Sequence, residues 1–277
     1  MIYMKLAFST LGCPSWNLRK IVEKAAEMGF DGVELRGLLG ELDISRRLEF
    51  TTELSKTRRL FAEHNVAISG IAVSARFAIV DPEEKKRQFD EAKRSLMIAA
   101  ELDAPILRIF GGRKPDGYTL ETIMPILVRN LQEIGDEAEE YDVTLAFETH
   151  DDWVSSSVCA RLMREVNHQR VQVLWDLHHP YRMKGEPPEV TYTNLAPYVV
   201  GIHVKDSIIN ENGEIKYVPL GEGDVPIKRM LELLVKGGYE GYATLEWEKR
   251  WHPELLDPEI IFPHYVQKMH EWLSNIR

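Results

Sequence analysis

The chain contains eight short runs of apolar and β-branched residues, separated by longer stretches in which apolar residues recur every three or four positions. The short runs have the character of buried β-strands, and the longer stretches have the period of amphipathic helices. The predicted strands begin near Lys5, Gly32, Val66, Ile106, Thr144, Val171, Val200 and Tyr242. The predicted helices span Leu18–Met28, Phe50–His64, Pro82–Leu102, Leu120–Tyr141, Ser155–Val166, Val190–Tyr198, Ile227–Lys236 and Pro258–Ile276.

Regular alternation of strands and helices predicts parallel strands joined by helical crossovers. Eight such units in 277 residues match the usual size of a (β/α)8 barrel. An open doubly wound sheet is the alternative, but it usually carries a glycine-rich first turn, and no G-x-G-x-x-G follows the first strand. We therefore expect a single (β/α)8 TIM barrel domain over residues 1–277. In the long loop Ser207–Asp224, the tip at Asn210–Gly213 predicts a turn or a small hairpin.

Composition and charge argue against several classes of function. The net charge is −10, and no block of Lys and Arg compensates for it, so we expect no binding to nucleic acid. No apolar run is long enough to cross a membrane, and the N-terminal residues lack the pattern of a signal peptide. Only two cysteines occur, Cys13 and Cys159, without a C-x-x-C motif, which fits a reducing compartment. These features predict a cytoplasmic protein.

Candidate chemistry gathers at the ends of the last four predicted strands, where the active sites of such barrels lie. Glu148, Asp176 and Glu246 end the fifth, sixth and eighth strands, and His203 lies on the seventh. Each follows an apolar run, where an unpaired charge is costly. Three carboxylates that converge in one mouth repel one another unless a cation separates them. We therefore predict that these four residues hold one divalent metal ion, with Mn²⁺, Mg²⁺ or Co²⁺ favoured by the oxygen-rich set and Zn²⁺ as an alternative.

Strand alternation supports this arrangement. If the four residues point into the barrel, the residues two positions earlier do so as well, and three of those are small. These inward residues are Ala146, Leu174, Gly201 and Thr244. The neighbours that would then face the helices are all large and apolar, namely Phe147, Trp175, Ile202 and Leu245.

Further polar and aromatic side chains fall on the same rim and are candidates for substrate contacts. Lys205 follows His203 by two residues, and His150 follows Glu148 by two. Arg108 lies near the end of the fourth strand, and Trp153 offers an aromatic wall for a sugar ring. Glu34 and Arg36, on the second strand, are expected to form a structural ion pair.

Taken together, the motifs resemble those of the xylose isomerase-like barrels, also called sugar phosphate isomerases/epimerases, over essentially the whole chain. They are D-G-V-E-L-R (31–36), E-T-H (148–150), W-D-x-x-H (175–179), H-V-K-D (203–206), P-L-G-E-G-D-V (219–225), G-Y-x-G (238–241) and T-L-E (244–246). The resemblance implies the same four metal ligands, Glu148, Asp176, His203 and Glu246. It implies that His179 contacts the substrate and that Glu148 and Glu246 are the catalytic acid/base pair.

The resemblance implies a metal-dependent isomerase or epimerase that moves a proton beside the carbonyl of a sugar or polyol through an enediolate. An inosose-type dehydratase on the same scaffold is an alternative. Metal-dependent phosphoester hydrolysis, as in the apurinic-site endonucleases of the family, is a further one, but it usually needs two or three metal ions. The negative net charge also argues against DNA as a substrate. By analogy with relatives, a homodimer or homotetramer is expected.

Overall fold

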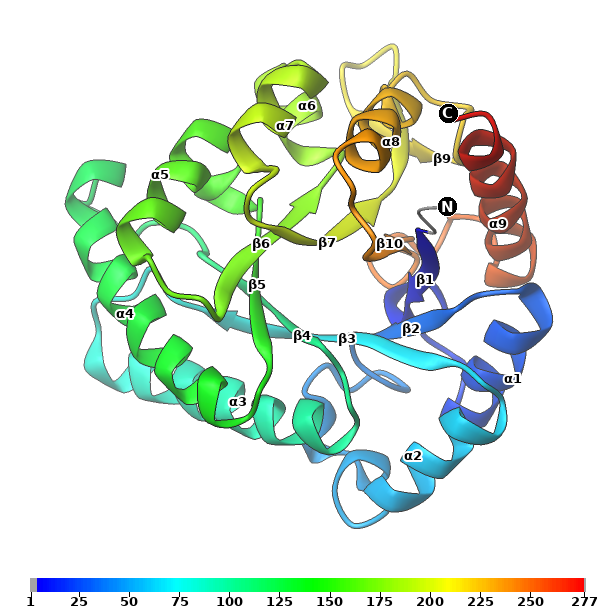
Figure 1. The fold of residues 1–277 in the computed structure, drawn as a ribbon, viewed down its shortest axis with the longest axis horizontal. Helices are drawn as coiled ribbons and strands as arrows, with labels where there is room; N and C mark the ends of the chain where they lie inside the picture. Colours follow the sequence, from blue (N-terminus) through cyan, green and yellow to red (C-terminus); the bar gives the residue numbers. More distant parts are fainter. Residues whose placement is uncertain (1–3, 277) are drawn as a thin grey trace.

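The eight predicted strands close into a barrel in the computed structural model, which describes residues 4–276 (Figure 1). All the barrel strands pair in parallel, and the eighth, β10, returns to pair with β1. The strands are β1 (Lys5–Ser9), β2 (Gly32–Leu35), β3 (Ala67–Arg76), β4 (Ile106–Phe110), β5 (Thr144–Glu148), β6 (Val171–Asp176), β7 (Val199–Val204) and β10 (Tyr242–Leu245). The predicted fold class is therefore confirmed. The outermost residues of the predicted domain, 1–3 and 277, lie outside the described residues.

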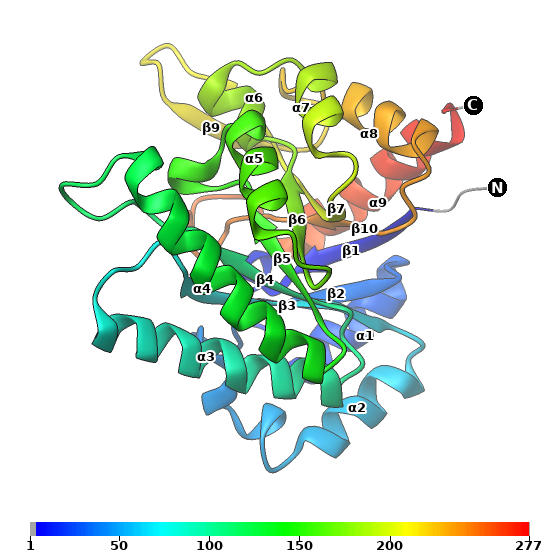
Figure 2. The ribbon, with the colours of Figure 1, turned by 60° about the vertical axis from the view of Figure 1, so that its left-hand side comes forward.

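A ring of helices covers the outside of the barrel (Figures 1 and 2). The helices are α1 (Leu18–Met28), α2 (Leu54–Glu63), α3 (Pro82–Glu101), α4 (Leu120–Glu140), α5 (Ser156–Val166), α6 (His179–Lys184), α7 (Pro188–Leu195), α8 (Ile227–Lys236) and α9 (Pro258–Ser274). Four short 3-10 turns add η1 (Thr10–Gly12), η2 (Ile44–Arg46), η3 (Leu48–Phe50) and η4 (Asp151–Trp153). Within residues 4–276, none of these helices combines the length and the hydropathy needed to span a membrane.

The observed elements differ from the predicted ones in a few places. The helix predicted from Phe50 begins at Leu54, because the turn η3 and the residues after it precede α2. The short helix α6 was not expected, and α7 begins before the predicted helix Val190–Tyr198. The loop tip at Asn210–Gly213 closes an antiparallel hairpin made of β8 (Asp206–Ile209) and β9 (Ile215–Val218), which confirms the hairpin alternative.

Contacts inside the barrel support the predicted orientation of the strand residues. A Cβ atom added to Gly201 on β7 would lie 3.1 Å from Ile106 Cδ1 on β4 and 3.6 Å from Leu174 Cδ1 on β6. Strands β5 and β6 separate β7 from β4 in the barrel, so Gly201 and Ile106 meet across the interior. Since side chains alternate along a strand, Asp176 and His203, two residues beyond Leu174 and Gly201, point inward as well.

The outer core is anchored by an aromatic cluster between β1 and α9. The ring centroid of Phe262 on α9 lies 4.3 Å from that of Phe8 and 5.8 Å from those of Trp16 and Phe30. Phe262 is fully buried, and a Cβ atom at Gly12 would come within 2.9 Å of its ring. This close packing attaches the last helix, α9, to the first strand, β1.

We expect Phe262→Ala to lower the free energy of unfolding by about 3–5 kcal/mol, because it removes a large ring from a packed site. Ile260→Ala on the same helix is the matched control, since Ile260 is 57% exposed, and we expect a change within about 0.5 kcal/mol. Urea unfolding followed by circular dichroism measures both values. Equal losses in the two variants would contradict the assigned core.

Candidate metal centre and the pocket beside it

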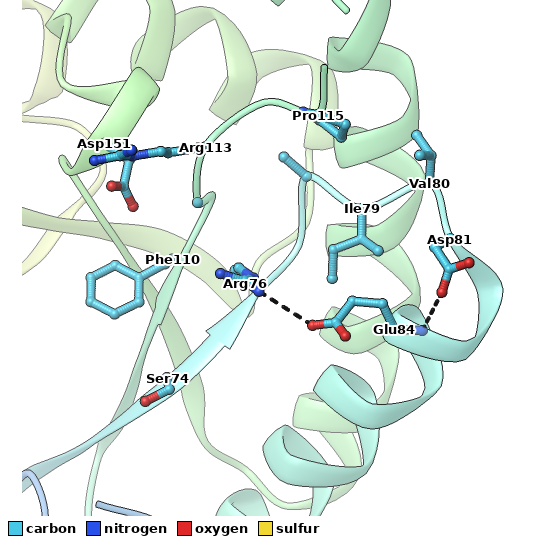
Figure 3. A pocket seen from close by; sticks show the side chains of 12 residues that line it. Ser74, Arg76, Ile79, Val80, Asp81, Glu84, Phe110, Arg113, Pro115 and Asp151 are labelled. Atoms are coloured by element: carbon cyan, nitrogen blue, oxygen red, sulfur yellow. Dashed lines mark hydrogen bonds and ion pairs between the residues drawn. The ribbon is translucent and has the colours of Figure 1, made fainter. Parts of the chain in front are cut away.

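A pocket of about 470 Å³ opens at the carboxyl ends of β3 and β4, between the start of α3 and the turn η4 (Figure 3). Its walls combine apolar side chains with charged ones, among them Arg76, Arg113 and Asp151. Ser74 and Phe110 line the same pocket. Active sites of α/β barrels lie at this end of the strands.

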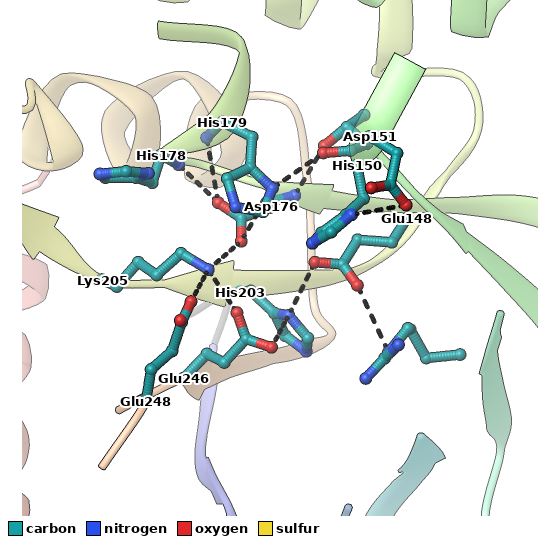
Figure 4. Close-up of polar contacts among 12 residues, drawn as sticks. Glu148, His150, Asp151, Asp176, His178, His179, His203, Lys205, Glu246 and Glu248 are labelled. Carbon is teal, nitrogen blue, oxygen red and sulfur yellow. Dashed lines mark hydrogen bonds and ion pairs between the residues drawn. The ribbon is translucent and has the colours of Figure 1, made fainter. Parts of the chain in front are cut away.

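The four predicted metal ligands meet at the barrel mouth next to this pocket (Figure 4). They come from the ends of β5 and β6, from β7, and from the residue just after β10. One ligand atom of each lies within 4.8 Å of the others, and all four residues are buried. These residues are Glu148, Asp176, His203 and Glu246. The structure therefore brings the predicted set together, while its role as ligands stays a prediction.

The imidazole of His203 is held in one orientation by Glu34 on β2. His203 Nε2 lies 2.9 Å from Glu34 Oε2, so this nitrogen donates its proton to the carboxylate. The other ring nitrogen, Nδ1, lies 3.5 Å from Glu148 Oε1 and 3.3 Å from Glu246 Oε1. A carboxylate behind a histidine is the usual outer partner of a metal-bound imidazole, since it fixes the tautomer and turns the free nitrogen toward the metal.

The expected ion pair between Glu34 and Arg36 is wrong. These two residues make no N···O contact within 4.0 Å of each other. Glu34 instead faces His203 across the barrel, and Arg36 Nη2 donates to Ser74 Oγ at 2.9 Å. Spacing along one strand predicted the pair, but partners from β3 and β7 lie nearer.

Several buried atoms of the cluster lack a hydrogen-bond partner, which tests whether the set suits a metal. Glu148 Oε1 and His203 Nδ1 belong to this group, as do Glu148 Oε2 and Asp176 Oδ2, which lie 3.3 Å from Arg108 Nε and 2.8 Å from Lys205 Nζ without an aligned hydrogen bond. Buried polar atoms are rarely left without partners, because each costs about 1–3 kcal/mol. Three carboxylates and one imidazole, turned toward one point, are the donors that a divalent ion of the Mn²⁺ or Zn²⁺ kind accepts. The residues present thus fit such an ion.

Lys205 lies at the side of the cluster and is almost fully buried. Its Nζ lies 2.8 Å from Asp176 Oδ2, 2.5 Å from Glu246 Oε2 and 2.9 Å from Glu248 Oε1. Burial alone would lower the pKa of Lys205, but these three carboxylates raise it well above its usual value. Lys205 is therefore a permanent cation that leaves Glu246 Oε1 free to face His203.

The charge of the cluster depends on the proton of His203. Burial would lower the pKa of His203, but the carboxylates of Glu246, Glu34 and Glu148 outweigh it and raise this pKa well above its usual value. A metal ion at Nδ1 would take the place of that proton, because only a neutral imidazole can act as a ligand. The four buried carboxylates (Glu34, Glu148, Asp176 and Glu246) then have two cationic side chains within 4.0 Å, Arg108 and Lys205, so that one divalent ion would balance the remaining two negative charges.

Both glutamates of the cluster are held as carboxylates. Burial and the charge of Glu246 would raise the pKa of Glu148, but Arg108 and His203 outweigh them and hold it well below its usual range. Burial would also raise the pKa of Glu246, and His203 and Lys205 keep it well below its usual value. Ionised carboxylates can bind a metal and accept a proton.

The predicted substrate residues fall into two groups. His179, at the start of α6, is buried, and its Nδ1 donates to the carbonyl oxygen of Thr149 at 3.0 Å. Burial is the main cause that lowers the pKa of His179, so the ring is neutral and its Nε2 can accept a hydrogen bond from a hydroxyl. The ring of His150 lies 4.9 Å from that of His179, at the rim of the cluster.

Arg108 and Trp153 support the site from behind. Arg108 Nε lies 3.3 Å from Glu148 Oε2, and its guanidinium stacks 4.0 Å from the ring centroid of Phe110. Trp153 is fully buried, and its indole nitrogen donates to the carbonyl oxygen of Gly112 at 2.9 Å. The structure therefore places Trp153 under the pocket loop rather than on an open wall.

The structure adds two contacts that sequence reasoning missed. Glu248 accepts from Lys205, and Tyr217 of the hairpin strand β9 donates to the same Glu248 oxygen at 3.3 Å. A second acidic and imidazole group, formed by Asp176, His178 and His179, shares Asp176 with the main cluster. Asp176 Oδ1 already accepts from the backbone N–H groups of His178 and His179, at 2.8 and 3.1 Å.

Comparison with known proteins defines the class. A family model described as "Xylose isomerase-like TIM barrel" matches residues 22–274, and the chain belongs to this family. The chain is 24% identical to fructoselysine 3-epimerase from Shigella flexneri over 260 residues, which cover 88% of this chain and 90% of that protein.

Two solved structures share the fold at lower identity. The IOLI protein with a bound zinc atom has a TM-score of 0.85 and 19% identity, covering 99% of both chains. The probable 3-DHS dehydratase AsbF from Bacillus anthracis has a TM-score of 0.80 and 17% identity, covering 96% of this chain and 99% of that one. At such identities these likenesses show the fold alone.

We expect Glu34→Gln to weaken Zn²⁺ binding by about 10-fold to 100-fold, because the amide holds the His203 imidazole less strongly than the carboxylate does. Competition with a chromophoric chelator gives the Kd. Glu23→Gln, at an exposed ion pair on α1, is the control and should leave the Kd unchanged. A Kd in Glu34→Gln within twofold of wild type, in a protein with a normal melting temperature, would refute the role of Glu34.

Proposed function

We propose that the protein is a divalent-metal-dependent isomerase or epimerase that moves a proton beside the carbonyl of a ketose or a related polyol. The observation that carries this proposal is the placement of two ionised carboxylates, Glu148 and Glu246, on either side of His203 Nδ1, at 3.5 and 3.3 Å. A substrate seated between them would present one face to each. The similarity to a sugar 3-epimerase over most of both chains supports the same reaction class.

The metal held by Glu148, Asp176, His203 and Glu246 would polarise the substrate's carbonyl and stabilise the negative charge that develops when the adjacent C–H loses its proton. One glutamate takes this proton on its carboxylate oxygen. In epimerisation, the opposite glutamate takes up a proton from solvent and passes it to the other face of the same carbon, while the first glutamate returns its proton to solvent. In isomerisation, a proton returns to the neighbouring carbon.

The surrounding side chains would bind and orient the substrate. The neutral His179 accepts a hydrogen bond from a hydroxyl through its Nε2. Lys205 keeps Glu246 ionised and turned toward the cluster, since its Nζ lies 2.5 Å from Glu246 Oε2. Arg108 does the same for Glu148 from the opposite side, at 3.3 Å.

A dehydratase is the second candidate, favoured by the fold shared with a probable dehydratase and by the permanent cation at Lys205. Such an enzyme begins with the same proton removal and then expels a hydroxyl group from the next carbon. The cation beside the cluster could stabilise the departing group. The two reactions differ in their products, since only dehydration forms a new double bond and releases water.

We expect the Mn²⁺-loaded protein to exchange a C–H proton of a ketose for deuterium from solvent. The panel would contain D-fructose, D-tagatose, D-psicose and fructoselysine, with NMR to detect exchange and to identify products. Glu246→Gln should lower the exchange rate by about 10²-fold to 10⁴-fold, because it removes one of the two acid/base groups.

The control for this experiment is Glu254→Gln, whose side chain is 72% exposed and which should exchange at the wild-type rate. Metal content must be measured in each variant, so that loss of metal is separated from loss of the base. Exchange at the wild-type rate by a fully metal-loaded Glu246→Gln protein would disprove the assignment. Release of water with formation of a double bond would favour the dehydratase.

A further inference from the structure

Arg36, the residue after β2, is a buried cation without an ionic partner. Its exposed fraction is 7%, and no carboxylate of the described residues lies within 4.0 Å of its nitrogens. The other buried cations of the barrel mouth differ in this respect. Arg108 pairs with Glu148, and Lys205 contacts three carboxylates. A buried guanidinium without a counter-ion is unfavourable, so this position calls for an anion.

The hydrogen bonds of Arg36 are also incomplete. Nη2 donates to Ser74 Oγ at 2.9 Å, whereas Nη1 is buried without a partner. Burial and the nearby charge of Arg108 lower the pKa of Arg36 to about 10, against the weaker opposing effect of Glu91, Glu246 and Glu34. The guanidinium is thus charged at neutral pH but poorly compensated.

Arg36 is connected to the larger pocket through its hydrogen bond to Ser74. Ser74, its hydrogen-bond partner, lines the pocket of about 470 Å³ and lies near the carboxyl end of β3 (Figure 3). Phe110 lines the same pocket, and the ring of Phe110 stacks on Arg108, which pairs with Glu148 of the cluster. Phe110 and Arg108 therefore connect the pocket to the metal cluster.

The pocket is lined by three carboxylates and two arginines, of which all but one arginine have a partner among the described residues. Glu84 contacts Arg76 and accepts from Arg87 and Gln88, Asp81 accepts from the backbone N–H of Glu84, and Asp151 contacts His150. At the rim, Arg113 makes no ion pair within 4.0 Å with any residue between 4 and 276.

A bound water is the simplest other explanation for the free nitrogen of Arg36. The residue also borders a second, very small cavity of about 10 Å³ near Thr10 and Gly37, which has room for about one water molecule. A water there would satisfy an N–H group, but it would leave the charge of Arg36 without compensation.

We propose that Arg36 and Ser74 bind an oxyanion of the substrate, a carboxylate or a phosphate, while the pocket with Arg113 at its rim holds the part of the substrate that carries it. The substrate is then an acidic sugar derivative rather than a neutral ketose. This inference rests on the proposed function, since it assigns the substrate class of the same site. A guanidinium offers two parallel N–H groups, which match the two oxygens of a carboxylate or phosphate.

The test compares three ligands that share the ketose end and differ at carbon 6: D-fructose, D-fructuronate and D-fructose 6-phosphate. Isothermal titration calorimetry on Mn²⁺-loaded protein gives each Kd. One of the two anions should bind about 10-fold to 100-fold more tightly than D-fructose, as expected for a charge-assisted hydrogen bond in a buried site. The tighter of the two identifies carboxylate or phosphate. Equal or undetectable binding of all three ligands would overturn the proposal.

Arg36→Gln should bring the ratio of the D-fructose Kd to the anion Kd close to one. Arg58→Gln, at an exposed surface ion pair with Asp103, is the matched control and should keep the wild-type ratio. A wild-type ratio in Arg36→Gln would overturn the proposal. Arg36→Lys keeps the positive charge but loses the two parallel N–H groups of the guanidinium, so it should give an intermediate ratio. This variant replaces Arg36→Gln in the test if the glutamine variant does not fold.

Two further readouts separate this inference from its alternatives. The melting temperature of Arg36→Gln should equal or exceed that of wild type, because the variant removes an uncompensated buried charge. A lower melting temperature with an unchanged ligand ratio would show a purely structural arginine. Solvent deuterium exchange in the same samples tests the proposed chemistry separately, so anion preference without exchange would reject the isomerase and retain the Arg36 site.

Discussion

Mutual repulsion among buried carboxylates is the constraint on which the barrel mouth depends. Glu148, Asp176 and Glu246 are fixed by strands that cannot move apart, and their ligand atoms lie within 4.8 Å of one another and of His203. Such a group is stable only if positive charge is placed among it. Lys205 and Arg108 supply part of that charge from the sides, and the unpartnered atoms in the middle mark where the rest belongs.

The same constraint gives the site its chemical asymmetry. Arg108 pairs with one oxygen of Glu148, and Lys205 pairs with one oxygen of Glu246. The other oxygen of each carboxylate therefore faces His203 Nδ1. Glu34 accepts a hydrogen bond from His203 Nε2, which orients the ring so that Nδ1 faces Glu148 and Glu246. Arg36 is the exception, because no carboxylate of residues 4–276 lies within 4.0 Å of its nitrogens. In the proposed site, the barrel would therefore hold a metal ion in the centre and leave one cation for an incoming ligand.

Much of this arrangement could be predicted from the sequence, because barrel geometry is periodic. Alternation along β6 and β7 turned Asp176 and His203 inward, and strand ends in such a barrel share one mouth. Contacts between strands that are distant in the sequence could not be predicted in this way. The Glu34–Arg36 pair followed from spacing on one strand, yet Glu34 meets His203, which lies 169 residues away. The burial of Trp153 likewise depends on the loop at Gly112, for which no periodic signal exists.

The metal centre itself is tested most directly by X-ray diffraction from crystals grown with Mn²⁺, measured on both sides of the manganese absorption edge. One anomalous peak per chain, in contact with Glu148, Asp176, His203 and Glu246, is the predicted result. An empty cluster at saturating Mn²⁺ would contradict the central claim. Two or more ions, with one on His178 and His179, would contradict the single-metal site and favour phosphoester hydrolysis.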